Sequence, residues 1–349
     1  MPTPRHIIRS KSVLELPIAH IKDVATEFHE LYRPEELVYA ERPGNKPHRY
    51  GQAHAFIAAV DHAQVIGSGS LVVDGKLLVH GLSTGNYAAN IQQQLKDYKG
   101  LPNGHTLDEE AVLVWGHPNF GHWVCTYLLR LTLLYYRPEL RRLPLLIRDD
   151  LPRRYIAWLE RMGFKHIITA ADGVKVRRLW VPSVVCYRGH YEDMGAYILP
   201  ESVHLLRTVL LGAQLPAFPR PRIYLSRRNA TWRRIENEDA VVHTLRSFNV
   251  HAVHMEELSL ADQLDLASRA ELIVVQCGGG SPITMLAPTD CRIIELNIPS
   301  FAGTFASRCW AHVLGQHFHR IDCKPTTKSG PMPTDWDSVA PVDELAALL

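Results

Sequence analysis

The sequence predicts an α/β protein made of two domains. Between residues 222 and 297, apolar β-rich runs alternate with segments whose apolar side chains recur at helical spacing, as in a parallel sheet covered by helices. A strand, a helix and a further strand are expected between residues 143 and 185 in the same way. The length of 349 residues also exceeds what one hydrophobic core usually serves, which favours two domains.

The first half begins with a predicted β-hairpin. Residues 65–80 contain two apolar runs joined at Asp74-Gly75, a dipeptide that readily adopts the positive φ angles of a tight turn. Residues 123–136 then keep apolar side chains at helical spacing as far as Pro138, which predicts a buried helix.

A strand, helix, strand unit follows this helix. Residues 143–147 are expected to form a buried strand, residues 152–162 a helix with Gly163 just after its last turn, and residues 178–185 another strand. Such alternation predicts a mostly parallel sheet in the first half as well.

The boundary between the two domains is expected between residues 200 and 221. A helix is predicted over residues 202–211, and the LPAFPRPR stretch after it holds three prolines, as linkers often do. We therefore assign residues 1–199 to the first domain and residues 200–349 to the second.

The second half alternates strands and helices from its start. Strands are predicted over residues 222–226, 250–254, 271–276 and 291–297, and a helix over residues 237–248. Asn249 fits a helix C-cap, and Ser259 to Asp262 resembles a capping box that begins the helix through Ala267. The pattern indicates a doubly wound unit of the nucleotide-binding type.

A glycine-rich turn follows the third of these strands. It comprises Cys277, Gly278, Gly279, Gly280, Ser281 and Pro282. Glycines let a backbone approach a ligand closely, and Ser281 as N-cap with Pro282 at the first helical position would start a helix there. A diphosphate would suit backbone N–H groups and a positive helix end. A plain tight turn is an equally good interpretation.

Basic residues cluster before this turn. Six arginines lie between residues 220 and 234, although the whole chain has a formal charge of only +2. Arg227 and Arg228 directly follow a strand, and a guanidinium can bind phosphate oxygens at two points. Glu295, near the end of the fourth strand, would either accept hydrogen bonds from ribose hydroxyls or form a salt bridge with an arginine inside the protein.

Composition excludes several classes of protein. The near-neutral charge does not favour nucleic-acid binding, and MPTPRHIIRSKS lacks the apolar stretch of a secretory signal. Residues 123–136 fall short of a membrane span, so we expect a cytoplasmic protein. The six cysteines and nineteen histidines show no zinc-ligand spacing, so we expect buried free thiols and no metal site.

Several motifs in order resemble glycosyltransferase family 61, which is related to capsular-polysaccharide transferases. They are RIYLSRRNATWRRIENEDAVVHTL, HMEELSLADQLDLASRAELIVVQCGGGSP and CRIIELN in the second half, and PNFGHW and RRLWVPS in the first. The resemblance implies a GT-B-like fold, in which two Rossmann-like, doubly wound domains face each other across a cleft. It also implies inverting transfer from a nucleotide-sugar donor, usually without a metal, with a UDP-linked sugar among the candidate donors.

The resemblance assigns roles to matched positions. Arg227 would contact the donor phosphate, while Arg234, Asn237 and Glu238 match the family's R-x-x-N-E element. Asn237 fits the helix N-cap equally well. Gln263 matches the family's glutamine before the third strand, and Glu295 its carboxylate in the fourth. This chain departs at Cys277, where the family commonly has a histidine, which puts donor identity and catalysis in question.

An inverting transfer requires a base in the first domain. His122 in NFGHW is the first candidate because imidazole titrates near neutral pH, although a histidine at a helix start can also simply cap or pack. Asp149, Asp150 and Asp193 are the alternatives. The expected acceptor is a glycan or a lipid-linked glycan, and the latter would bring the protein into peripheral contact with a membrane.

Two other functions fit the same residues. A protein that binds a nucleotide or glycan without transferring sugar would explain Cys277. Pyruvyl transfer to a sugar on a GT-B-like scaffold would also need phosphate-binding arginines.

Overall fold

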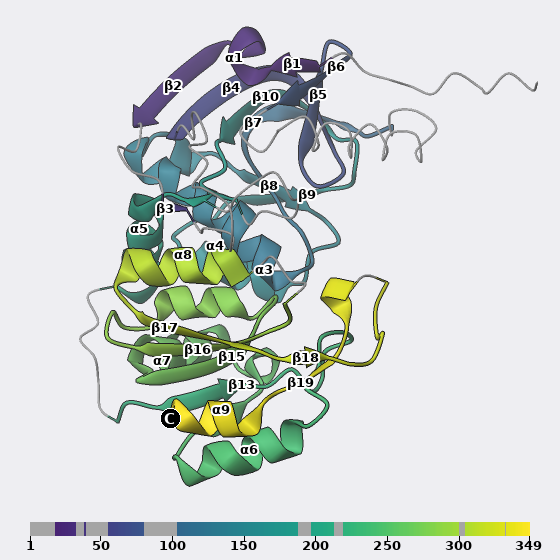
Figure 1. The fold of residues 1–349 in the computed structure, drawn as a ribbon. Helices are drawn as coiled ribbons and strands as arrows, with labels where there is room; N and C mark the ends of the chain where they lie inside the picture. Colours follow the sequence, from purple (N-terminus) through teal and green to yellow (C-terminus); the bar gives the residue numbers. More distant parts are fainter. Residues whose placement is uncertain are drawn as a thin grey trace, which may run out of the picture.

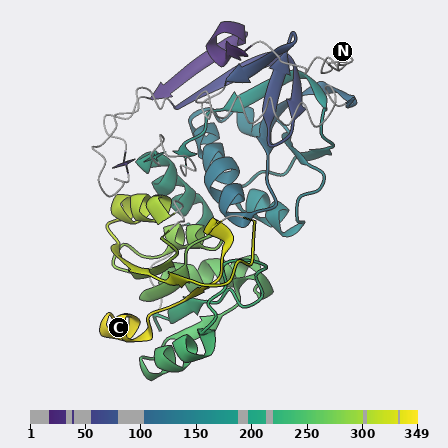
Figure 2. The same cartoon turned by 45° about the vertical axis from the view of Figure 1, so that its right-hand side comes forward.

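The computed structural model describes residues 18–32, 38–39, 55–79, 103–187, 197–212, 219–299, 304–331 and 333–349. Two sheets lie toward opposite ends of the molecule, and helices fill the space between them (Figures 1 and 2). The α/β class predicted from the sequence is therefore confirmed. The start of the chain, Asp193 and most of the proline-rich segment after residue 212 fall outside the described residues.

The larger sheet is only half parallel. Its strands run in the order β1-β6-β5-β4-β10-β7-β8-β9, with β2 (Glu27–Tyr32) paired to β4 (Ala55–Ile66). The strands β10 (Lys175–Pro182), β7 (Thr106–Trp115), β8 (Leu145–Arg148) and β9 (Ile167–Ala170) are parallel neighbours.

The expectation of a mostly parallel first sheet was wrong for its other half. The strands β4, β5 (Ser70–Val73) and β6 (Lys76–Val79) pair antiparallel, because very short turns connect them. The predicted hairpin is confirmed, with φ of 46° at Asp74 and 70° at Gly75. β1 (Ile18–His20) adds to β6 in parallel, ahead of the short helix α1 (Ile21–Val24).

The buried helix predicted over residues 123–136 is helical throughout but is not an α-helix. One turn of α-helix, α3 (Phe120–His122), continues as the π-helix η1 (Trp123–Leu128) and then as the 3₁₀-helix η2 (Leu129–Tyr136). Apolar periodicity does not distinguish these geometries over so short a run. The 3₁₀ turn η3 (Leu140–Arg142) leads into β8.

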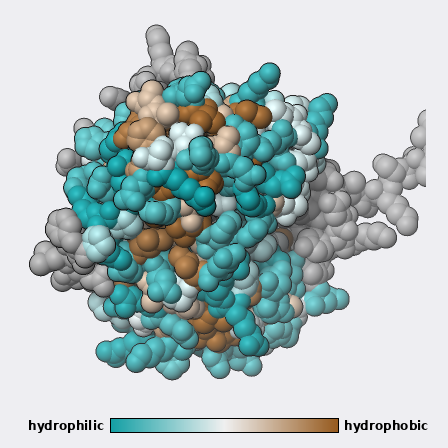
Figure 3. Space-filling model, turned by 90° about the horizontal axis from the view of Figure 1, so that it is seen from below, coloured by the Kyte–Doolittle hydropathy of each residue, from teal (hydrophilic) through white to brown (hydrophobic). Residues whose placement is uncertain are grey.

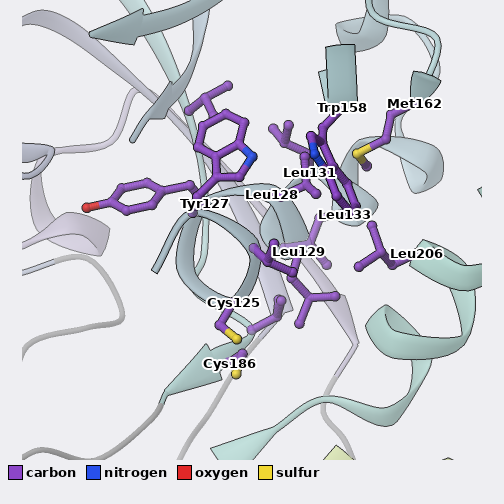
Figure 4. Close-up of a cluster of buried hydrophobic side chains, with 14 of the residues drawn as sticks. Cys125, Tyr127, Leu128, Leu129, Leu131, Leu133, Trp158, Met162, Cys186 and Leu206 are labelled. Atoms are coloured by element: carbon purple, nitrogen blue, oxygen red, sulfur yellow. The ribbon is translucent and has the colours of Figure 1, made fainter. Parts of the chain in front are cut away.

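Two further helices pack on this segment. They are α4 (Arg154–Arg161), which ends before Gly163 at a φ of 84° as predicted, and α5 (Pro200–Leu211). Trp158 and Met162 approach from α4 and Leu206 from α5 toward the leucines of η1 and η2 (Figure 4). A small sheet, β11-β12-β3 (Cys186–Tyr187, Tyr197–Ile198 and Val38–Tyr39), lies beside α8 (Thr304–Leu314).

The second half contains a fully parallel five-stranded sheet in the order β14-β13-β15-β16-β17. Its strands are β13 (Arg222–Leu225), β14 (His251–Val253), β15 (Leu272–Gln276), β16 (Arg292–Asn297) and β17 (His317–Asp322). In chain order this is 2-1-3-4-5, the order of a doubly wound sheet whose direction of progression reverses between β13 and β15.

Helices cover both faces of the parallel sheet. α6 (Glu238–Ser247) and α9 (Val342–Ala347) pack on one face, and the end of the molecule that they form is mostly hydrophilic (Figure 3). On the other face lie α7 (Leu260–Arg269), the 3₁₀-helix η5 (Ser281–Leu286) and α8. α7 begins at Ser259, whose hydroxyl accepts from the Asp262 N–H as predicted, and Asn249 has the positive φ of 57° expected after α6.

One continuous core joins the two halves. Apolar side chains of the larger sheet, of the helices η1, η2, α4 and α5, and of the facing surface of the parallel sheet belong to a single buried cluster. Helix α5 contacts η2 on one side and α7, η5 and α8 on the other. The segment 324–340, with β18 (Lys324–Pro325), η6 (Pro333–Asp335) and β19 (Ser338–Val339), returns across the parallel sheet to α9.

Candidate functional site

A cavity of about 470 Å³ lies at the carboxyl ends of β13 and β15. Leu225 at the end of β13 and Ser226 just after it line the cavity, as do Val275 and Gln276 of β15 and Gly279 and Gly280 of the turn that follows. Because the strand order reverses between these two strands, the loops leaving them diverge to opposite faces and leave a crevice. This is where open α/β sheets bind ligands.

The first half of the chain forms another wall of this cavity. Phe120 of α3 and the residues Arg154, Tyr155 and Trp158 of α4 line it. The Phe120 ring lies 5.5 Å from the Trp158 ring between centroids, so the two rings make one aromatic surface. The cavity is therefore built from both halves, and even its nearest lining residues across them, Trp158 and Leu225, lie far apart in sequence.

Arg227 brings a fixed positive charge to the cavity. Its Nη2 donates to the Trp232 carbonyl at 3.0 Å and its Nε to the Arg233 carbonyl at 3.3 Å, which holds the guanidinium in place. Burial and the neighbouring Arg233 lower the pKa of Arg227 from 12.5 to about 10. The side chain therefore stays charged at neutral pH, next to the glycine turn.

The glycine turn differs from its prediction in one respect. Gly280, and not Ser281, occupies the N-cap position, and η5 is a 3₁₀-helix of six residues. The Ser281 hydroxyl instead accepts from the Gly278 N–H at 3.1 Å and so closes the turn on itself. A serine followed by proline suggested an N-cap. The turn is so tight that the Ser281 hydroxyl bonds the Gly278 N–H of its own loop and not an N–H of the helix. A strong helix dipole is therefore absent from this turn.

The other predicted phosphate ligands of the second half have protein partners. Arg228 points to Glu238 and Asp239 and lines a separate cavity of about 390 Å³ beside α6. Arg234 pairs with Asp337, with 2.8 Å between Nη2 and Oδ2. Arg227, Arg228 and Arg234 are thus neighbours in sequence, but their side chains have different partners in the folded protein.

The matched polar residues at the start of α6 also serve the fold. Asn237 is the N-cap residue without a side-chain capping bond, and its carboxamide bonds both the N–H and the carbonyl of Ala340 at 2.9 Å. Glu238 is buried and accepts from the Ser226 hydroxyl at 2.7 Å. Asn237 and Glu238 are absent from the lining of the larger cavity.

Cys277 and Glu295 are fully buried. Burial and the nearby Glu295 raise the pKa of the Cys277 thiol to about 12, so it stays protonated. Glu295 accepts from the hydroxyls of Ser307 at 2.9 Å and Ser281 at 3.4 Å. It thus bonds two serines, and its expected contact with ribose stays a prediction. All six cysteines are free and buried, as predicted.

The described candidate bases, His122, Asp149 and Asp150, all belong to the first half of the chain. His122 ends α3, whose N-cap is Asn119: the Asn119 Oδ1 accepts from the backbone N–H groups of Gly121 and His122 at 2.9 and 3.3 Å. A Cβ placed at Gly279 would lie 3.6 Å from that same oxygen. The loop carrying His122 therefore abuts the glycine turn, although His122 itself does not line the cavity.

Asp149 and Asp150 follow β8 as predicted but lie away from the cavity lining. Asp150 forms a two-point pair with Arg148, with 2.8 Å between Nε and Oδ1. Both aspartates are exposed.

Sequence reasoning missed a second histidine beside His122. The His117 ring lies 4.8 Å from the His122 ring between centroids, and its Nδ1 accepts from the Asn119 N–H at 2.9 Å. Burial, and then the positive charge of Arg148, lower the pKa of His117 below 6.5, while Asp150 acts in the opposite direction. His117 stands five residues before His122, and no periodicity would have linked them.

Gln276 was missed for a similar reason, because it appears in the sequence only as the polar end of an apolar strand. Gln263, matched to the family from its sequence, also lines the cavity, where its Nε2 donates to the Met255 and Leu258 carbonyls.

Within the described ranges, no group of three or more His, Cys, Asp or Glu side chains could hold a metal ion. No described helix is both long and apolar enough to cross a bilayer.

An α/β fold with an arginine and glycines at the carboxyl edge of a parallel sheet is typical of proteins that bind phosphorylated ligands. Comparison with known families makes this specific. The profile of glycosyltransferase 61 matches residues 120–294, half of the chain, and spans the α3, α4, β13 and β15 walls of the cavity. The chain belongs to the glycosyltransferase 61 family.

Among solved structures, the chain is distantly similar to the iron-containing dodecameric glycosyltransferase TibC from enterotoxigenic E. coli H10407. The sequence identity is 10%, the match covers 66% of this chain and 67% of that chain, and the TM-score is 0.35. A complex of the dodecameric iron-containing heptosyltransferase TibC with ADP-D-beta-D-heptose matches at 10% identity, 66% and 65% coverage, and a TM-score of 0.34. No curated protein matches this chain.

Proposed function

We propose that this protein is an inverting glycosyltransferase that transfers a sugar from a nucleotide-sugar donor to a glycan or lipid-linked glycan acceptor. The observation that carries the proposal is the position of Arg227, held by two carbonyls in a cavity at the switch point of the parallel sheet. A GT-B-like arrangement, with the donor on the second half and the acceptor approaching from the first, is part of the same proposal.

The leaving group determines what the cavity must supply. As the bond between the anomeric carbon and the diphosphate oxygen breaks, negative charge grows on the diphosphate. The charged Arg227 guanidinium stabilises that charge, and the glycine turn lets the phosphates approach its backbone closely. No step of this mechanism assigns a role to a metal ion.

The attacking group requires a base. In the proposed mechanism, His122 accepts the proton of the acceptor hydroxyl while the oxygen attacks the anomeric carbon from the side opposite the diphosphate. A single displacement of this kind inverts the configuration. The cap at Asn119 keeps the start of α3 against the glycine turn, and thus keeps His122 near the donor side.

Thermal unfolding with a panel of nucleoside diphosphates and nucleotide sugars tests donor binding, since a ligand of the native state raises the Tm. We expect the diphosphate of one nucleobase to raise the Tm most, both with and without EDTA. This Tm shift should be lost in Arg227→Ala. Arg220→Ala is the matched control, because Arg220 pairs with Asp290 away from the cavity. Absence of any shift with nucleotides would contradict the proposal.

Transfer itself is measured by the anomeric configuration of the product in NMR, where inversion is expected. Donor binding without transfer to any glycan acceptor would indicate a binding protein instead. A Tm shift with phosphoenolpyruvate alone would indicate pyruvyl transfer.

A further inference from the structure

The cavity has an apolar surface that a diphosphate would not use. Besides Arg227 and the glycines, its lining includes the aromatic pair Phe120 and Trp158 and a set of aliphatic or thioether side chains, namely Leu225, Met255, Leu258, Leu260, Val275 and Ile283. Apolar walls of this kind accept a flat ring and exclude water from it. This surface suits a second part of the ligand that is planar and largely apolar on its faces.

Within this lining, Gln276 lacks the bonds that a buried amide normally makes. The residue has no exposed surface, and in the described part of the chain neither Oε1 nor Nε2 has a hydrogen-bond partner. The Nε2 groups of two other glutamines are satisfied: that of Gln263 by two carbonyls and that of Gln316 by the Thr284 carbonyl at 2.9 Å. A buried carboxamide without partners destabilises a fold, so a partner from outside the chain is expected.

The chemistry of the carboxamide limits that partner. It presents one acceptor and one donor side by side in a plane, and both are satisfied together by a ring edge that carries a donor next to an acceptor. Phosphate oxygens only accept and would leave Oε1 without a partner. Nucleobases have such an edge and have apolar faces that suit the surrounding walls.

We propose that Gln276 is a specificity-determining residue that hydrogen-bonds the nucleobase of the donor. This inference rests on the proposed function and adds a residue to it. Arg227 then binds the phosphates and Gln276 reads the base, and both side chains leave the carboxyl ends of adjacent strands, β13 and β15. The affinity for pyrophosphate therefore depends on Arg227 and not on Gln276.

The test compares Gln276→Leu with wild-type protein. Leucine has a similar volume and no hydrogen-bonding group, so the unliganded variant should melt at the same temperature as wild type or higher. Its Kd for the preferred nucleoside diphosphate should rise on the order of tenfold or more, because a buried hydrogen-bond pair is lost. Its Kd for pyrophosphate should stay within about twofold of wild type, as the phosphate contacts are intact.

Gln316→Leu is the matched control, since it removes a buried glutamine that lies outside the cavity and whose Nε2, unlike that of Gln276, donates to backbone carbonyls. We expect it to lower the Tm and to leave the nucleotide Kd unchanged. If Gln276→Leu lowers the Tm to a similar extent, Gln276 is structural and the inference is wrong. An equal loss of pyrophosphate affinity would also overturn it, because Gln276 would then act on the phosphates.

The failures of the two proposals are distinguishable. Nucleotide binding by wild type that Gln276→Leu does not weaken overturns the role of Gln276 alone. The role of Gln276 alone is also overturned if, in a crystal structure of the nucleotide complex, an ordered water and not the nucleobase bonds the Gln276 amide. Absence of nucleotide binding by wild type overturns the proposed function and this inference together.

Discussion

Gly278 lies directly against the Arg227 guanidinium. A Cβ built on Gly278 would stand 3.1 Å from the Arg227 Nη1, and the residue has a φ of 147°, a conformation that side chains with a Cβ rarely adopt. The turn after β15 and the residue after β13 are therefore fitted to each other, although about fifty residues separate them in sequence.

The first prediction concerns this contact. Gly278→Ala should lower the free energy of unfolding by about 1–3 kcal/mol through backbone strain. It should also weaken nucleoside diphosphate binding on the order of tenfold by displacing the Arg227 guanidinium. Gly280→Ala is the control, because no atom lies within 4 Å of a Cβ at that position. Denaturant unfolding and calorimetry measure the two effects, and equal behaviour of the two variants would contradict the prediction.

The second prediction concerns the cap of α3. Asn119→Ala removes the oxygen that accepts from Gly121 and His122, so we expect a loss of about 1 kcal/mol in unfolding free energy. Turnover should fall with it, because His122 is no longer held beside the glycine turn. Asn119→Asp keeps the accepting oxygen and should retain most of both quantities. A turnover that Asn119→Ala leaves unchanged would remove the positioning role.

The third prediction concerns pH. The folded protein lowers the pKa of His117 below 6.5, so it favours the neutral ring, and protonation would break the bond from the Asn119 N–H to Nδ1. The stability that this provides is complete above about pH 6.5, the pKa of an unperturbed histidine, and is lost as the pH falls through the lower folded pKa. His117→Asn, which does not titrate, should therefore show a smaller fall in Tm between neutral pH and pH 5.

Parallel curves of Tm against pH for wild type and His117→Asn would show that His117 does not cause the loss of stability at low pH. Unfolding followed by circular dichroism at each pH gives the two curves.

The fourth prediction concerns the base. His122→Ala should lower kcat by roughly 100- to 10,000-fold, the usual contribution of a general base, while the Tm and the donor Kd change little. The control His204→Ala removes an exposed histidine of α5 and should have wild-type kinetics. If His122→Ala retains wild-type turnover, His122 is not the base, and the alternatives Asp149, Asp150 and Asp193 must be tested.

The sequence predicted the second half well because its signals are local. Apolar periodicity placed β13 to β16, α6 and α7, and the Ser259 cap and Asn249 marked helix ends through bonds within a few residues. In the first half, the same reasoning found the Asp74-Gly75 hairpin, η1, η2 and α4. It did not find the antiparallel pairing of β4 with β2 and β10 or the π- and 3₁₀-helical geometry, which depend on how strands pair and how a helix packs.

By itself, the sequence determined the α/β class, the order of elements, the glycine turn and the family, since all of these follow from residue types at short spacing. The tertiary structure decided which side chains meet. It separated Arg227 from Arg228 and Arg234, which pair with carboxylates. It also buried Gln276, without a hydrogen-bond partner among the described residues, in the cavity that α3 and α4 help to line. The physical reason is that ion pairs and cavities depend on distances through space, which spacing along the chain does not fix.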